Sequence, residues 1–199
     1  MLVVGINGSP RPNGGTAELL GCALEEAAIA GAQTIYFQAV EGLRGVKVPY
    51  CIHCSNPCEG ACYRGTRLDE MFAVMSRADG LILGSPVYFG TVAAPLKAFW
   101  DKTRKLRKEK TLLNVVGGGV VCGASRFGGQ EATLQVLMAM MLCQGMTVVG
   151  DGHPGDDPGH LGACVQYAAD TYGEGPARAR VLARRVVDVS RATQVLRVR

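Results

Sequence analysis

Residues 5–16 read Gly-Ile-Asn-Gly-Ser-Pro-Arg-Pro-Asn-Gly-Gly-Thr, and this stretch decides the fold. An apolar run precedes it at residues 1–4, and a helical pattern follows from Ala17. Because a strand, a glycine-rich turn and a helix together present free backbone N–H groups at the helix N-terminus, the stretch predicts a phosphate site. Its side chains add further donors and a cation: Ser9, Arg11, Asn13 and Thr16.

Apolar runs and helical patterns alternate along the rest of the chain. The runs predict five strands, at residues 2–6, 34–38, 81–84, 112–116 and 146–149. Helical spacing predicts helices at residues 16–30, 68–75, 95–103 and 134–141, and a last one from Pro176. Three loops are expected: a glycine-rich one after residues 112–116, and long ones at 41–67 and from 150 to about 175. This alternation predicts an α/β fold with a parallel sheet and helices on both faces.

The length of 199 residues suits a single domain that spans residues 1–199. Lysines and arginines concentrate in residues 97–110 and 178–199 of a chain whose net charge is +4. Aromatic residues are not interleaved through these segments in the pattern typical of nucleic-acid sites, so they indicate solvated helix faces. No apolar run reaches membrane-spanning length and no signal peptide is visible, so we expect a cytoplasmic protein without membrane contact.

The first loop lacks the motifs of two common phosphate-binding loops, and this narrows the class of ligand that it could bind. A P-loop ends in Gly-Lys-Ser/Thr, whereas residues 14–16 read Gly-Gly-Thr without a lysine. The dinucleotide fingerprint needs a different glycine spacing and an acidic residue after the second strand, which here ends in Phe37-Gln38. Hydroxyl, amide and backbone donors suit a monophosphate better, and FMN is such a ligand. A turn that only joins strand and helix is the remaining alternative.

Residues 8–16 resemble the FMN phosphate loop of the NADPH-dependent FMN reductase superfamily. The resemblance covers roughly residues 2–150 by the order of elements. It implies a three-layer flavodoxin-like sandwich with five parallel strands in the order 2-1-3-4-5, and FMN at the carboxyl ends of strands one and three. On the first loop it assigns FMN binding to Ser9, Arg11, Asn13, Gly14 and Thr16.

Two further segments match the same superfamily. Residues 84–90, Gly-Ser-Pro-Val-Tyr-Phe-Gly, follow the third predicted strand, and in the family this segment lines the isoalloxazine ring. Residues 126–131, Arg-Phe-Gly-Gly-Gln-Glu, are similar to a motif of the iron–sulfur flavoprotein branch, and a cation there would stabilise reduced, anionic flavin. The resemblance thus implies FMN contacts from Pro86, Val87, Tyr88, Phe89, Gly90, Ser125 and Arg126.

Four of the eight cysteines, Cys51, Cys54, Cys58 and Cys62, form C-x2-C-x3-C-x3-C within the loop 41–67. In a reducing compartment the quartet indicates a 4Fe–4S cluster ahead of structural zinc, disulfides or an unliganded loop. The iron–sulfur flavoproteins carry a compact cysteine-rich insertion at this place, usually with the spacing C-x2-C-x2-C and a longer gap to the fourth cysteine. The other four cysteines, Cys22, Cys122, Cys143 and Cys164, are scattered along the chain. Cys22 and Cys143 are expected as small core residues within helices, and Cys122 in the third flavin loop.

The resemblance implies an FMN-dependent oxidoreductase of the iron–sulfur flavoprotein type, in which the cofactors and not a side-chain catalyst carry the chemistry. Two alternatives stay open: an NAD(P)H-dependent FMN or quinone reductase without a cluster, and a non-enzymatic electron carrier. The expected partners are NAD(P)H or a redox protein such as ferredoxin, with a small-molecule or quinone acceptor. The cations of residues 97–110 and 178–199 could attract an anionic cofactor such as NADPH. Because members of the family pair, a homodimer or homotetramer is expected.

Overall fold

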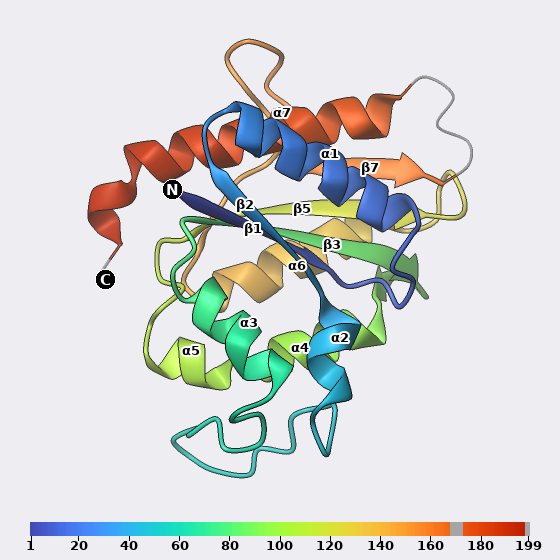
Figure 1. The fold of residues 1–199 in the computed structure, drawn as a ribbon. Coiled ribbons are helices and arrows are strands. Elements are labelled where there is room, and N and C mark those ends of the chain that lie inside the picture. The colour runs from blue at the N-terminus through green and yellow to red at the C-terminus, as the bar shows by residue number, and fades with distance from the viewer. Residues whose placement is uncertain (168–172, 198–199) are drawn as a thin grey trace.

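Residues 1–167 and 173–197, which the computed structural model describes, contain one seven-stranded sheet (Figure 1). Five strands cross it in the order β2-β1-β3-β5-β6, and each neighbouring pair is parallel. This order corresponds to the predicted 2-1-3-4-5, but the predicted count of five strands is wrong. The strands are β1 (Leu2–Asn7), β2 (Gln33–Gln38), β3 (Gly80–Tyr88), β4 (Thr91–Val92), β5 (Val116–Gly123), β6 (Thr147–Val148) and β7 (Ala163–Gln166).

Two short strands account for the difference in count. β4 pairs antiparallel with the end of β3, with Val87 opposite Val92, and forms a hairpin at the carboxyl edge of the sheet. β7 pairs parallel with β5 beyond the point where β6 stops: β6 reaches Gly117, and β7 begins opposite Val120. The last position of the sheet is therefore filled by two strand segments, with residues 149–162 between them.

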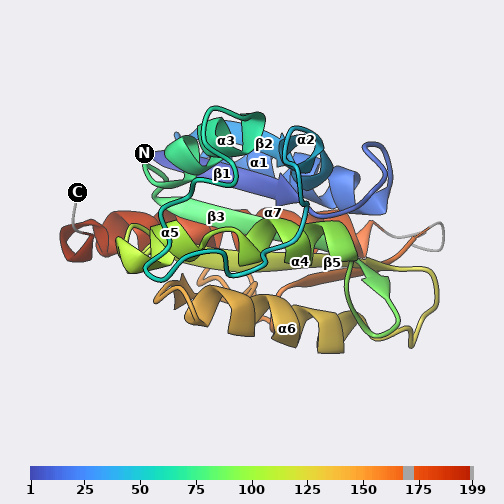
Figure 2. The same cartoon turned by 90° about the horizontal axis from the view of Figure 1, so that it is seen from below.

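Helices cover both faces of the sheet and complete three layers (Figures 1 and 2). The first and last helices lie together on one face, and the others lie on or below the opposite face. Successive residues of β1 point to the two faces, since Val3 and Val4 belong to different core clusters. The helices are α1 (Gly15–Ile29), α2 (Ala39–Arg44), α3 (Arg67–Met75), α4 (Ala94–Asp101), α5 (Arg104–Lys108), α6 (Gln130–Leu142) and α7 (Glu174–Ala192), followed by the 3-10 turn η1 (Gln194–Leu196).

The glycine-rich stretch predicted as a loop is the buried strand β5, and the strand predicted at residues 112–116 contributes only Val116 to it. Glycine disfavours strands, so local pattern reading fails here. A Cβ atom at Gly117 would lie 2.5 Å from Sδ of Met141, and one at Gly118 would lie 2.8 Å from Cδ1 of Leu182. The glycines therefore let α6 and α7 approach β5 closely from opposite faces.

Two further boundaries differ from the prediction. β3 continues to Tyr88, so Ser85 to Tyr88 lie within the strand and not after it. The start of the predicted loop 41–67 is helical, because Gly42 of α2 sits close to the side chain of Met71 on α3. The four cysteines follow in residues 45–66, where the chain has turns and bends but neither an α-helix nor a strand.

Some residues near helix ends lie outside the helices predicted for them. Thr103 follows α4, where its hydroxyl donates to the carbonyl of Trp100 and accepts from Nε2 of Gln144. Cys143, predicted as a core residue, is exposed just after α6, whereas Cys22 is half-buried in α1. On α6, Met140 is buried and the predicted Met138 is only half-buried. Among the described residues, no helix combines the length and the apolar character that crossing a membrane requires.

The predicted long loop 150–175 is partly structured, and its residues 168–172 lie outside the described part of the chain. β7 forms part of it, and residues 149–162 are fixed to α7 by ion pairs. Arg178 binds the buried carboxylate of Asp151 and also that of Asp157, 2.9 Å away. The hydrogen bond from Arg178 holds the pKa of Asp157 below its ordinary value. This segment is therefore anchored to the fold.

Candidate functional site

A cleft of about 210 Å³ lies at the carboxyl ends of β1, β3 and β5. It brings together eight of the twelve residues predicted to bind FMN, from two segments about 70 residues apart in the chain. Those eight are Ser9, Arg11, Asn13, Gly14, Thr16, Pro86, Val87 and Tyr88. The first loop supplies one side of the cleft and the end of β3 supplies another.

The first loop is held close to the neighbouring strand. The N–H of Gly8 donates to the carbonyl of Gly84 over 2.8 Å. A Cβ atom at Gly8 would lie 2.4 Å from Cβ of Leu96 on α4, so the close approach requires glycine. The hydroxyl of Ser9 accepts the N–H of Arg11 over 3.1 Å and shapes the turn that follows. The loop is therefore placed by tertiary contacts as well as by its own turn chemistry.

The loop delivers the N-terminus of α1 to the cleft. α1 begins at Gly15, and both Gly15 and the buried Thr16 line the cleft. The first N–H groups of a helix lack intrahelical partners and carry a partial positive charge, and Arg11 adds a full one. A Cβ atom at Gly15 would lie 2.5 Å from Sγ of Cys122, so the helix start is packed directly against β5. The arrangement suits a terminal phosphate group.

Four predicted residues do not line this cleft. Phe89 and Gly90 form the tip of the β3–β4 hairpin, both with positive φ, and the Phe89 side chain is fully exposed. Ser125 and Arg126 lie in the exposed loop after β5, and Arg126 borders a neighbouring cleft of about 640 Å³ together with Phe127. We call the cleft of about 210 Å³ the FMN cleft, after the prediction that eight of its lining residues bind FMN. The exposed aromatic rings at this edge offer apolar surface beside it.

Sequence reasoning missed five residues that line the cleft: Gly15, Cys122, Gly123, Ala124 and Tyr167. Cys122 lies in β5 and not in a loop, and burial raises the pKa of its thiol. Tyr167 follows β7 and reaches the cleft because its N–H donates to the carbonyl of Gly123 over 2.8 Å. No local signal marks Tyr167, because its position depends on the pairing of β7 with β5.

The cysteine quartet lies beside the basic segment that follows α4. Nζ of Lys102 donates to Sγ of Cys62 over 3.7 Å, and a nitrogen of Arg104 lies 2.9 Å from Nε2 of His53. Cys54 and Cys62 are exposed, and Cys51 and Cys58 are half-buried. Positive side chains next to the quartet would offset the negative charge of a thiolate-bound cluster.

Tyr63 supplies a second observation on this loop. Its ring packs edge-on against Phe72 at 5.0 Å between centroids and fixes the end of the loop to the core. Its hydroxyl is buried without a hydrogen-bond partner among the described residues. Burial raises the pKa of this hydroxyl, and the nearby Cys58 and Cys62 raise it further. A buried hydroxyl donor of this kind suits a sulfur acceptor. The thiols of the loop and this hydroxyl are therefore groups of the type that bind and surround an iron–sulfur cluster.

The thiols themselves are not gathered. Within residues 1–167 and 173–197, no three histidine, cysteine, aspartate or glutamate side chains are placed to hold a metal ion. Cluster binding therefore requires residues 45–66 to draw the four thiols together, in the way that metal binding is often coupled to local folding.

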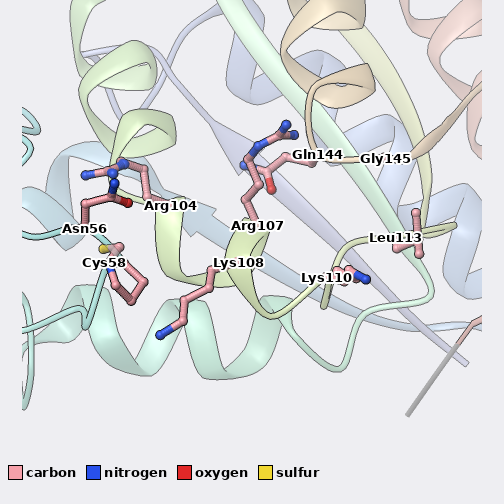
Figure 3. A pocket seen from close by; sticks show the side chains of 10 residues that line it. Asn56, Cys58, Arg104, Arg107, Lys108, Lys110, Leu113, Gln144 and Gly145 are labelled. Carbon is pink, nitrogen blue, oxygen red and sulfur yellow. The ribbon is translucent and has the colours of Figure 1, made fainter.

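A second cleft, of about 530 Å³, adjoins the cysteine loop (Figure 3). Asn56 and Cys58 stand on one side of it, and Leu113 and Lys110 stand on the other. Its positive charge comes from α5 and the turn that follows it: Arg104, Arg107, Lys108 and Lys110. Lys108 pairs with Glu59 at 3.2 Å, whereas no carboxylate of the described residues lies within 4.0 Å of Arg107 or Lys110. We call this the basic cleft.

The basic cleft and the FMN cleft lie at opposite ends of the sheet. Leu113 and Gly145 of the basic cleft come just before β5 and β6, whereas Cys122 and Gly123 of the FMN cleft end β5. The eight residues of β5 separate them by roughly 25 Å at about 3.3 Å per residue. The four cations that line the basic cleft therefore lie far from the predicted flavin site, so NADPH attracted by them would not lie at the flavin.

Comparison with known proteins agrees with this geometry. Residues 1–159 match the family described as NADPH-dependent FMN reductase. An iron–sulfur flavoprotein of Methanocaldococcus jannaschii is 46% identical over 156 residues, which cover 77% of this chain and 78% of that protein. An NAD(P)H dehydrogenase (quinone) of Chromohalobacter salexigens is 34% identical over 120 residues, 57% of this chain and 60% of that protein. The crystal structure of a flavodoxin, WrbA-like protein from Agrobacterium tumefaciens aligns with a TM-score of 0.65 and 21% identity, over 96% of this chain and 98% of that one.

Proposed function

We propose, because this chain belongs to the NADPH-dependent FMN reductase family and to its iron–sulfur flavoprotein branch, that it passes electrons between FMN and an iron–sulfur cluster or an external partner. The predicted family is confirmed, and with it a flavin-dependent oxidoreductase that uses FMN; this disfavours the non-enzymatic carrier. The observation that carries the proposal is the cleft in which the first loop, the end of β3 and the end of β5 meet.

The proposed binding residues divide by the part of FMN that they face. Ser9, Arg11, Asn13, Gly14 and Thr16, with the N-terminus of α1, hold the phosphate. Pro86, Val87 and Tyr88 would form an apolar wall for the ring. Phe89, Gly90, Ser125 and Arg126, which lie outside this cleft at the same edge of the sheet, would contact the outer edge of the ring. When bound, FMN supplies both two-electron and one-electron chemistry. The chain binds and orients it, and we assign no side chain as a proton donor or nucleophile.

The cysteine-rich segment at residues 41–67 is the proposed insertion in an otherwise single FMN-binding domain. Cys51, Cys54, Cys58 and Cys62 would be the cluster ligands, and a 4Fe–4S cluster would supply one-electron transfer. Lys102 at Cys62 and the unpartnered hydroxyl of Tyr63 support this assignment.

The basic cleft supports a place for an external one-electron partner. Four cations beside Cys58 favour the acidic face of a small redox protein, for example a ferredoxin, through complementary charge. NAD(P)H would instead meet the flavin at the carboxyl edge of the sheet. The acceptor would be a small molecule or a quinone. We also propose a homodimer or homotetramer, in which a second copy covers the exposed aromatic rings beside the FMN cleft.

The alternative is an NAD(P)H-dependent FMN or quinone reductase without a cluster, and the ungathered thiols favour it. Anaerobic reconstitution with iron, sulfide and FMN distinguishes the two. We expect one flavin per chain, equal amounts of iron and sulfide, and a brown chromophore. Cys58→Ser should lose the iron and keep the flavin, whereas Cys143→Ser, outside the quartet and exposed, should keep both. A chain that binds FMN but no iron under these conditions would be the cluster-free reductase.

A further inference from the structure

Four residues form a closed ring of hydrogen bonds behind the first loop. The N–H of Ser9 donates to Oδ1 of Asn7 over 2.9 Å, and Nδ2 of Asn7 donates to Oη of Tyr36 over 2.8 Å. Oη of Tyr36 donates to Oε1 of Gln38 over 3.2 Å, and Nε2 of Gln38 donates to the carbonyl of Ser9 over 2.6 Å. The ring thus ties both main-chain groups of Ser9 to the ends of β1 and β2.

Every bond in the ring runs in the same direction, so each bond polarises the next. The two amides have one orientation that completes it. Turning the Asn7 amide would place its NH2 group against the N–H of Ser9, and turning the Gln38 amide would place two carbonyl oxygens together. The main chain of Ser9 therefore fixes both side chains, and they fix it in return.

The ring is shielded from water over most of its length. Asn7 is 0%, Gln38 5% and Ser9 6% exposed, and Tyr36 is the one member at the surface. A buried amide that loses its partner cannot readily replace it with water, so each break carries the cost of an unsatisfied polar group. Burial also raises the pKa of Tyr36, which keeps the hydroxyl protonated and able to donate at neutral pH.

The ring leaves the phosphate-facing groups of the loop free. It uses the main chain of Ser9 and not its hydroxyl, which accepts the N–H of Arg11, and Ser9, Arg11 and the N-terminus of α1 line the cleft. Gln38 also ends β2, the position where dinucleotide-binding chains place an acidic residue on the ribose. Here that side chain is turned under the loop and its carbonyl and amide are both used.

We propose that Gln38 and Tyr36 are positioning residues for the FMN phosphate: through the ring they hold the first loop in its binding shape before the ligand arrives. The proposal rests on FMN as the ligand of this loop. Neither side chain lines the cleft, so both act through Ser9. The same use of Gln38 removes a ribose acceptor from the end of β2 and favours a monophosphate over a dinucleotide.

The test compares two flavins that differ only in the phosphate. FMN and riboflavin are titrated into the apoprotein, and affinity is read from flavin fluorescence. Gln38→Leu removes both of its hydrogen bonds and leaves the Ser9 carbonyl without its buried donor, so it should lower the affinity for FMN about tenfold or more and leave that for riboflavin within about twofold. Gln38→Glu keeps the size of the side chain and the bond from Tyr36, but it cannot donate to the Ser9 carbonyl. It should therefore lower the affinity for FMN at least as much as Gln38→Leu does.

Two further variants separate positioning from folding. Tyr36→Phe breaks the middle of the ring but keeps the bond from Gln38 to Ser9, so the affinity for FMN should fall by only about threefold. Gln33→Leu, at the exposed start of the same strand, should change nothing. If Gln38→Leu does not fold, Tyr36→Phe decides the question by the same ratio of affinities.

The proposal is overturned if the variants lower the affinities for FMN and riboflavin equally, since the ring would then support the fold in general. It is also overturned if Gln38→Leu binds FMN as the wild type does. A wild-type apoprotein that binds neither flavin contradicts the proposed function itself, before any variant is compared.

Discussion

At the residue scale, Gly14 and Gly15 look alike in the sequence but have different surroundings. A Cβ atom at Gly15 would meet Sγ of Cys122 at 2.5 Å and the Tyr167 ring at 2.7 Å, whereas one at Gly14 would meet nothing within 4 Å. At the junction of β1 and α1, an added side chain would thus clash at position 15 but not at position 14. Glycine at position 15 serves packing, and glycine at position 14 serves access to the ligand.

We expect Gly15→Ala to lower the stability of the apoprotein by about 1–3 kcal/mol, or roughly 3–8 °C in Tm, because overpacking exceeds the gain in helix propensity. Gly14→Ala should melt close to the wild type. Differential scanning fluorimetry of the two apoproteins measures the difference. Equal melting temperatures would contradict the packing that we describe at Gly15.

The eight cysteines should divide sharply in their reactivity. Burial raises the pKa of the Cys164 thiol to about 12 and also raises that of Cys122, so at pH 8 both hold little of the reactive thiolate. Cys54, Cys62 and Cys143 are exposed. We expect iodoacetamide to modify these three at least about tenfold faster than Cys122 and Cys164.

Peptide mass spectrometry over a time course measures these rates, and the same reaction in denaturant is the control, since all eight thiols should then react alike. After cluster reconstitution, Cys54 and Cys62 should become protected while Cys143 still reacts. Rapid modification of native Cys164 would show that the end of β7 is not packed as described.

At the element scale, β5 depends on its glycines because helices press on both of its faces. Leu182 of α7 is fully buried against Gly118, and three of its side-chain atoms would lie within 3.3 Å of an added Cβ. Met141 of α6 stands in the same relation to Gly117 on the other face. The strand and the two helices therefore form one packing unit.

Gly118→Ala should destabilise the chain by about 1–3 kcal/mol, and Leu182→Ala by about 2–5 kcal/mol through a cavity. Because the added methyl group fills space that the leucine vacates, the double variant should cost less than the sum by about 1 kcal/mol or more. Chemical denaturation of the four proteins gives the cycle. Gly21→Ala, with open space on the surface of α1, is the matched control and should not destabilise. Strict additivity would mean that α7 does not press on β5 at this point.

At the scale of the whole molecule, the two clefts lie at opposite ends of the strands of the sheet. The FMN cleft opens at the carboxyl ends of the strands, and the basic cleft with Cys58 opens at the amino ends. The separation of roughly 25 Å exceeds the reach of direct hydride transfer from a nucleotide in the basic cleft to the flavin. If an electron donor binds at the basic cleft as proposed, it would therefore pass electrons through the cysteine loop and not directly to the flavin.

The double variant Arg107→Glu, Lys110→Glu should slow reduction by an acidic ferredoxin about tenfold at low salt and flatten the salt dependence, because it reverses the local field. Oxidation of NADPH, which needs only the flavin edge, should stay within about twofold of the wild type. Stopped-flow reduction over a salt series measures the first effect. The double variant Arg180→Glu, Arg185→Glu on α7, on the opposite face of the sheet, makes the same change in net charge and is the control. An equal loss of rate with both electron donors would contradict separate binding sites for the two donors.

The sequence by itself determined the features that depend on neighbours along the chain. The stretch 5–16 indicated a strand, an anion-binding turn and a helix, and the alternation of elements predicted a parallel sheet with helices on both faces, while the order of its strands came from the family resemblance. Cys51 to Cys62 were found as a quartet because their spacing is local. Turn chemistry, periodicity and motif spacing all act within a few residues, so a single sequence reveals them.

Only the tertiary structure decided the features that depend on distant partners. Gly118 lies in a strand and not in a loop because Leu182, 64 positions away, fills the space above it. Tyr167 reaches the FMN cleft through the pairing of β7 with β5, and Gln38 lies under the loop through its bond to Ser9. The physical reason is shared: close packing and buried hydrogen bonds join groups that the chain brings together only when it folds.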